Sequence, residues 1–184
     1  MTNKLARVSI FTMTVLYLLS CATTGGNNST GVELTRDIKT KISSSCFEVL
    51  VEKPVVDSIR YEKELPWEEI PYSIRVDRYY SIGTAFAVSE TELLSACHVL
   101  NLTRDSRIYV KAFIRDKDGN VFEIENITAF DTHKDFVKFT VKDKKFSTWF
   151  TFNGSYETND AVFSVGNAYG EGIIVRKGEI LGVM

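Results

Sequence analysis

Hydrophobic and polar residues alternate along several short stretches between residues 46 and 142, as they do in half-buried β-strands. The alternation is clearest in residues 136–142, where Val137, Phe139 and Val141 share one face. Six short antiparallel strands favour an all-β fold that closes into a small barrel, because closure leaves no unpaired edge. We place the strands at residues 46–53, 81–88, 92–96, 106–114, 121–131 and 136–142.

The stretches around these strands are less regular. Residues 54–78 are rich in charge and contain three prolines, which predicts a long surface excursion between strands. We also predict a short helix within residues 32–42 and a single helical turn after His98. Beyond residue 159, two more strands are predicted, one at 161–166 and one within 173–184, with a glycine-containing turn between them.

The first twenty residues have the pattern of a targeting segment. Lys4 and Arg7 precede about twelve mainly apolar residues, too few to span a bilayer but enough for a signal sequence. The segment ends in Leu18-Leu19-Ser20-Cys21, which resembles the lipobox of bacterial lipoproteins. That resemblance implies a signal peptide over residues 1–20, a lipid anchor on Cys21 and a place in the cell envelope. The alternative is an ordinary signal peptide with a coincidental cysteine.

Composition excludes some functions and leaves others open. The 22 basic and 24 acidic residues nearly cancel, so there is no electrostatic case for nucleic-acid binding. The small, polar residues 21–45 predict a flexible tether between the membrane and the folded part. A disulfide between Cys46 and Cys97 is possible in an oxidising compartment, but the sequence does not decide it.

Residues 81–100 read as a hairpin that leads into His98. Thr84-Ala85-Phe86 and the run from Leu94 to Leu100 resemble the histidine hairpin of trypsin-like serine peptidases. Residues 131–139 are similar to the stretch that holds the acid of the family's catalytic triad, and the match places that acid at Asp135, 37 positions after His98. Residues 163–167 and 178–181 resemble the opening of the second barrel in bacterial members, with Ala168 in place of the usual proline.

The resemblance implies a trypsin-like first barrel over residues 46–145, then a linker and an incomplete second barrel over residues 146–184. It implies that His98 is a general base and that Asp135 is a buried carboxylate that orients it. The substrate would be a protein or peptide, and no cofactor or metal is implied.

The third member of the triad is absent from the sequence. The family's Gly-Asp-Ser-Gly-Gly motif does not occur, and Ser155 comes before the strands of the second unit. We therefore expect either a truncated peptidase or a degenerate relative, without peptidase activity in isolation. The rival hypothesis is a non-catalytic surface lipoprotein that uses a peptidase-derived barrel as a binding module.

Several residues have simpler explanations. A metal site built from Cys97, His98, His133 and Asp135 is disfavoured, because it lacks paired-ligand spacing. Asp131 and His133 fit a solvated turn, and Cys97 fits a core-filling role rather than a nucleophile. The glycine-rich residues 166–172 lack the lysine and helix of a phosphate loop, so a tight turn is predicted there.

Overall fold

The computed structural model describes residues 33–54, 68–105, 111–167 and 172–182. The chain divides into a unit Met1–Glu33 and a unit Leu34–Met184, and the description below concerns the second. The predicted signal peptide, Cys21 and the first part of the predicted tether lie outside the described residues. So do most of the predicted excursion and the first half of the predicted strand at 106–114.

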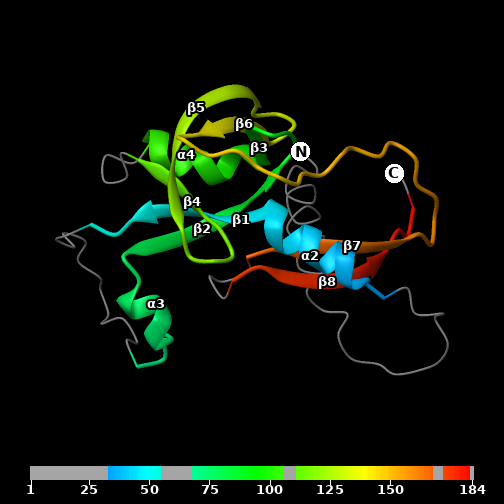
Figure 1. Cartoon of the computed structure of the whole chain (residues 1–184), viewed down its shortest axis with the longest axis horizontal. Helices are drawn as coiled ribbons and strands as arrows, with labels where there is room; N and C mark the ends of the chain where they lie inside the picture. The colour runs from blue at the N-terminus through cyan, green and yellow to red at the C-terminus, as the bar shows by residue number, and fades with distance from the viewer. Residues whose placement is uncertain (1–32, 55–67, 106–110, 168–171, 183–184) are drawn as a thin grey trace, which may run out of the picture. The chain divides into compact units, whose positions relative to one another are not determined.

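Six antiparallel strands close into a barrel in the order β1-β2-β3-β6-β5-β4 (Figure 1). This confirms the predicted all-β fold with a six-stranded barrel. Where the residues are described, the predicted boundaries agree with the structure to within two positions. The strands are β1 Cys46–Glu52, β2 Tyr79–Ala87, β3 Glu92–Ser95, β4 Ala112–Arg115, β5 Val121–Asp131 and β6 Phe136–Val141.

The inward faces of these strands form the core. Val49, Leu93, Ile114 and Phe139 are fully buried, and each comes from a different strand. Alternate residues of β6 are buried, as the sequence pattern predicts for a strand with one face on the core. Burial of such side chains stabilises the barrel by about 1.5–3 kcal/mol each.

Three helices accompany the barrel among the described residues. The helix predicted within residues 32–42 is present but lies a few residues later, one helix is longer than predicted, and one was not predicted. Helix α2 spans Arg36–Ser45, so the last ten residues of the predicted tether are helical. The helix forms because the side chain of Thr35 accepts a hydrogen bond from the Ile38 N–H (3.3 Å) and because Ile42 is buried.

Helix α3, Tyr72–Val76, follows Pro71 within the predicted excursion. None of the residues of α3 is buried. The helix therefore has no apolar face whose repeat in the sequence could have predicted it. Helix α4, Cys97–Asp105, replaces the predicted single turn. Among the described residues, no helix has both the length and the apolar character needed to cross a membrane.

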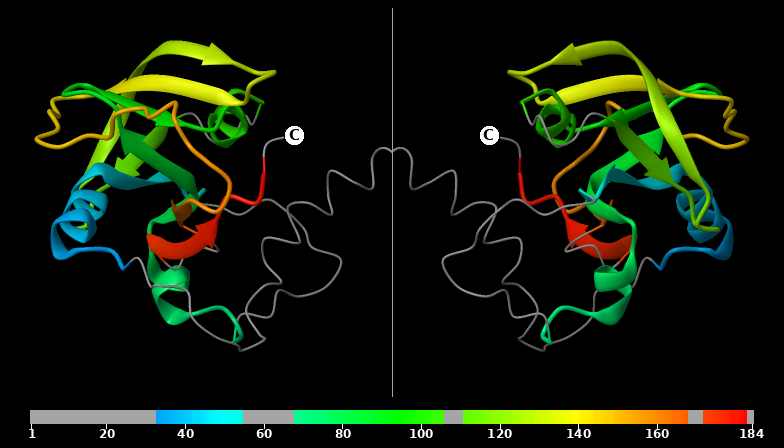
Figure 2. Two further views of the ribbon diagram at one scale, coloured as in Figure 1. Left: turned by 90° about the vertical axis from the view of Figure 1, so that its right-hand side faces the viewer. Right: turned by 90° about the vertical axis from the view of Figure 1, so that its left-hand side faces the viewer.

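The predicted strands of the second unit are confirmed as a hairpin. Strands β7 (Ala161–Gly166) and β8 (Ile174–Glu179) form a two-stranded antiparallel sheet of their own. Figure 2 shows this hairpin in orange and red, below the yellow-green strands β5 and β6 and above helix α3.

Candidate active site

His98 lies in the first turn of helix α4, directly after the histidine hairpin. Strand β3 ends at Ser95, so the histidine lies on the helix that follows, which begins two residues earlier than the predicted helical turn. The next two residues, Val99 and Leu100, are buried and anchor this helix on the core. The His98 side chain points the other way and is 72% exposed.

Asp135 lies in the turn between β5 and β6. Strand β6 pairs with β3 so that Val137 is opposite Ser95, which brings this turn next to the start of α4. The backbone of Asp135 has φ 53°, a left-handed conformation that costs a non-glycine residue roughly 1–2 kcal/mol, less for aspartate. The register and this conformation together direct the carboxylate to the helix.

The two carboxylate oxygens of Asp135 make different contacts with His98. Oδ1 accepts a hydrogen bond from the His98 backbone N–H (2.9 Å), and Oδ2 lies 2.7 Å from the ring nitrogen Nδ1. The Asp135 carbonyl also accepts the backbone N–H of Cys97 (3.2 Å). One residue therefore satisfies two free donors at the start of α4 and holds the imidazole ring as well.

This geometry selects the tautomer of His98. A carboxylate oxygen can only accept, so Nδ1 carries the proton in the neutral ring and Nε2 keeps its lone pair. An imidazole in this state can take a proton from a hydroxyl group and return it to a leaving group. The pair His98 and Asp135 can therefore act as a general base and its orienting acid.

The surroundings of Asp135 keep it ionised. The backbone N–H of His98, then the His98 side chain, hold the pKa of the Asp135 carboxyl below its ordinary value, with burial opposing them. The side chain of Asp135 is 48% exposed, which corrects the expectation of a buried carboxylate. Hydrogen bonds, rather than a buried ion pair, orient this group.

No nucleophile stands beside this pair in the described part of the chain. No hydrogen bond reaches Nε2 of His98 from the described residues. Ser155 lies in an exposed turn, where its N–H donates to Asn153 Oδ1 (3.1 Å). The described residues thus hold a base and an acid without the third member of a triad.

The remaining candidates have structural roles. Cys46 and Cys97 are both free and buried, so the disulfide that the sequence left open is not formed. Burial raises the pKa of the Cys46 thiol to about 11. The His133 N–H donates to Asp131 Oδ1 (2.8 Å) in an exposed turn. No group of three metal-ligating side chains gathers within the residues that the structure describes.

Sequence reasoning missed Asn167, which joins the hairpin to the barrel. Its backbone N–H donates to Thr84 Oγ1 (2.7 Å), and its side-chain amide donates to Ser81 Oγ (2.6 Å). Its Oδ1 accepts the N–H of Gly172 (3.0 Å) and so closes the loop between β7 and β8. The sequence marked this position only through the Gly166-Asn167 pair, and nothing in that pair indicates a contact with β2.

Comparison with known proteins supports the fold. No family model and no curated protein matches the sequence. Among solved structures, the chain is similar to the HtrA-type protease AlgW with decapeptide, at 17% sequence identity and a TM-score of 0.56. The match covers 77% of this chain and 43% of that one, so this chain spans less than half the length of its neighbour. At this identity the likeness shows the fold alone, and the fold is that of a trypsin-like barrel.

Proposed function

We propose that the chain carries the histidine and aspartate of a trypsin-like serine endopeptidase, with His98 as general base and Asp135 as the acid that orients it. The observation that carries the proposal is the contact of 2.7 Å between Nδ1 and Oδ2, together with the second bond from the same carboxylate to the His98 N–H. The trypsin-like fold of an HtrA-type protease structure supports it.

In such a reaction, Nε2 of His98 takes the proton of a serine hydroxyl while the serine oxygen attacks the peptide carbonyl carbon. The imidazolium then gives this proton to the leaving amine, and the ionised Asp135 stabilises the imidazolium in between. A protein or peptide is the substrate, in keeping with the decapeptide named with the protease of similar fold. The sequence contains no Gly-Asp-Ser-Gly-Gly run to supply this serine, so we expect residues 22–184 alone not to hydrolyse peptides.

The activity test uses purified residues 22–184 with casein and with fluorogenic peptides. We expect no turnover above that of the His98→Ala variant. Turnover that His98→Ala abolishes would contradict inactivity of this segment, and it would support the catalytic role of the histidine.

The geometry can be tested without activity. In an ¹⁵N NMR spectrum of the histidine rings, we expect His98 to carry its proton on Nδ1 when neutral, and Asp135→Asn to remove that preference. His133 serves as the internal control, because it is exposed and only its backbone N–H is bonded to Asp131. A neutral His98 protonated on Nε2 would overturn the proposed base.

The rival candidate is a binding module that keeps the barrel without catalysis. It is favoured by the free Nε2 of His98 within the described part of the chain. The reading frame after codon 184 and the intact mass of the native protein separate the two. A frame that continues into a Gly-Asp-Ser-Gly-Gly-like run supports the peptidase, whereas a stop codon there, with a matching native mass, supports the binding module.

We further propose that the protein is a bacterial lipoprotein, held in the cell envelope by a lipid on Cys21. The support is the lipobox-like run Leu18-Leu19-Ser20-Cys21. Growth with a labelled fatty acid should label the wild type and leave Cys21→Ser unlabelled and released from the membrane fraction. Equal membrane retention of both forms would contradict this anchor.

A further inference from the structure

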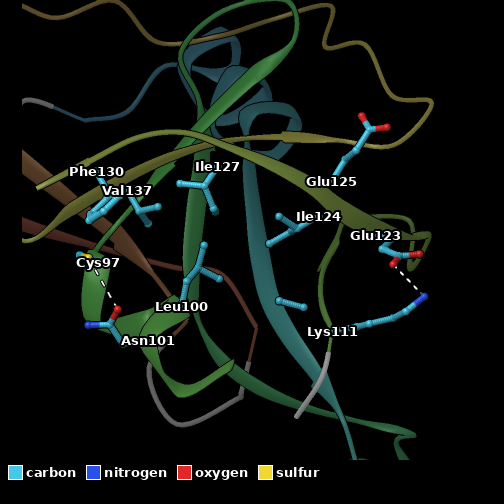
Figure 3. Close-up of a pocket in the computed structure, with 11 residues that line it drawn as sticks. Cys97, Leu100, Asn101, Lys111, Glu123, Ile124, Glu125, Ile127, Phe130 and Val137 are labelled. Atoms are coloured by element: carbon cyan, nitrogen blue, oxygen red, sulfur yellow. Dashed lines mark hydrogen bonds and ion pairs between the residues drawn. The ribbon is translucent and has the colours of Figure 1, made fainter. Parts of the chain in front are cut away.

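A cavity of about 430 Å³ lies between helix α4 and strand β5 (Figure 3). It does not include His98 or Asp135, although Cys97, the neighbour of His98, is in its wall. Leu100, Ile124 and Ile127 lie along its middle in Figure 3. Cys97 and Asn101 are at one end, and Lys111 and Glu123 are at the other.

The volume and the lining suit an organic molecule better than water. Small-molecule pockets commonly measure about 300–1,000 Å³ and are mainly apolar with a few polar groups. Water beside Leu100, Ile124 and Ile127 lies against apolar side chains, so an apolar molecule gains free energy by replacing it.

The charges at one end disfavour an anion. Lys111 Nζ is already paired with Glu123 (2.9 Å), and this partner raises the pKa of Lys111. Glu125 also lines the cavity and forms no ion pair with any described residue. The three side chains together carry a net charge of about −1 at neutral pH, which would repel a carboxylate or phosphate.

At the opposite end of the cavity, a thiol and an amide contact each other. The Cys97 thiol donates to Asn101 Oδ1 at 3.9 Å, a long contact that turns the amide oxygen to the sulfur. The amide nitrogen of Asn101 makes no hydrogen bond with other described residues, and Figure 3 draws it pointing away from the other side chains of the lining. Neither Cys97 nor Asn101 brings a charge to this end of the cavity.

We propose that this cavity, which we call the α4–β5 pocket, binds a small, neutral, mainly apolar molecule. The proposal does not depend on peptidase activity, because neither His98 nor Asp135 lines the pocket. Its walls come from helix α4 and from β4, β5 and β6, which are three strands of one closed barrel.

The test is an NMR titration of the ¹⁵N-labelled full chain with three probes of equal chain length: 1-hexanol, hexylamine and hexanoate. We expect 1-hexanol to shift the amides of Asn101, Ile124 and Ile127 in a saturable way. Hexanoate should bind about tenfold more weakly, because its charge has the sign of Glu123 and Glu125. Shifts that do not saturate, or hexanoate binding as tight as that of 1-hexanol, would overturn the proposal. Hexylamine carries a positive charge and so tests the sign of the charge effect. Weaker binding of hexylamine than of hexanoate would also overturn the proposal.

A blocking variant tests the location. Ile127 is 49% exposed, so Ile127→Trp can fill the pocket without entering the buried core, and 1-hexanol binding should be lost. The matched control is Val76→Trp, at a position that is 58% exposed on α3 and outside the pocket, and it should bind as the wild type does. Unchanged binding by folded Ile127→Trp would show that the probe binds elsewhere.

A measurement on the wild type covers the case in which Ile127→Trp does not fold. The Cys97 thiol is in the pocket wall, so saturating 1-hexanol should slow its alkylation by iodoacetamide severalfold. Peptide mapping separates this thiol from Cys46, which does not line the pocket and whose rate should not change. Equal alkylation of Cys97 with and without 1-hexanol would count against the site.

Discussion

At the scale of single residues, Asp135 joins a structural role to a chemical one. Its carboxylate and carbonyl accept from the first backbone N–H groups of α4, and its second oxygen holds the His98 ring. The left-handed backbone at Asp135 is unfavourable in itself, but it directs the carboxylate to both the backbone N–H and the ring of His98. Removing the His98 ring alone should therefore leave the hydrogen bonds between Asp135 and the backbone of α4 in place.

The His98→Ala variant separates these contributions. We expect the pKa of Asp135 to rise toward its ordinary value without reaching it, because the ring contact is lost while the backbone N–H groups of residues 97 and 98 still donate. The carboxyl ¹³C shift, followed by NMR from neutral to acidic pH in both proteins, measures this change. An identical titration of wild type and variant would show that the ring does not contribute.

At the scale of elements, strand β2 lies between the helix of the site and the hairpin. On one side, Gly83 lies so close to α4 that an added Cβ would be 2.7 Å from both γ carbons of Val99. On the other side, Ser81 and Thr84 accept hydrogen bonds from Asn167. The spacing between β2 and α4 thus depends on the absence of one side chain.

We expect Gly83→Ala to destabilise the protein by about 1–3 kcal/mol, because the new methyl group forces Val99 or the helix to move. Adding Val99→Ala should recover part of this loss, since it removes the clashing carbons. Urea unfolding of the single and double variants measures the effect. Gly154→Ala is the matched control, because no atom lies within 4 Å of its added Cβ, and it should be close to neutral.

We expect Asn167→Ala to loosen the β7–β8 hairpin, because a two-stranded sheet is marginally stable without contacts to other elements. Amide hydrogen exchange in β7 and β8 should become faster by an order of magnitude or more, while the strands of the barrel change little. Asn153→Ala removes a side chain from an exposed turn and serves as the control. Faster exchange in both variants would argue against a specific role for Asn167.

At the scale of the whole unit, Arg115 connects segments that are far apart in the sequence. This residue of β4 pairs with Glu48 of β1 and with Asp77, just before β2, and all three side chains are largely buried. Burial raises the pKa of Asp77, but hydrogen bonds from Arg115 and from the Tyr79 N–H outweigh it and the net pKa lies below the ordinary value. A carboxyl whose pKa is lower in the folded than in the unfolded protein stabilises the fold at any pH above its unfolded pKa. This stabilisation is lost as the pH falls through the pKa of the folded protein.

We therefore expect Arg115→Met to lower the free energy of unfolding by about 1–3 kcal/mol at pH 7, because it leaves two carboxylates without their partner. The difference from wild type should narrow at an acidic pH below the lowered pKa of Asp77, where this carboxyl is protonated in both proteins. Urea unfolding at both pH values measures this. Arg78→Met breaks an ion pair with Glu52 in which Arg78 is 74% exposed, and it should cost less than about 1 kcal/mol.

The barrel could be predicted because each strand has one face on the core, and this produces a local alternation such as that of β6. The positions of His98 and Asp135 followed from motifs of known order. Other features depend on contacts that leave no local pattern. Asn167 contacts residues 83 and 86 positions away, and the exposure of Asp135 depends on what surrounds it. Helix α3 has no buried residue to mark it.

The double role of Asp135 affects how relatives of this chain should be interpreted. A relative without hydrolytic activity still needs a group to cap the helix that follows β3, so selection for a stable barrel would retain the aspartate. The His98 ring is exposed, and its one described partner is Asp135, so it is free to change once catalysis ceases. Among homologous sequences, the residue at the position of His98 should therefore distinguish active peptidases from inactive relatives. The residue at the position of Asp135 should be aspartate in both groups.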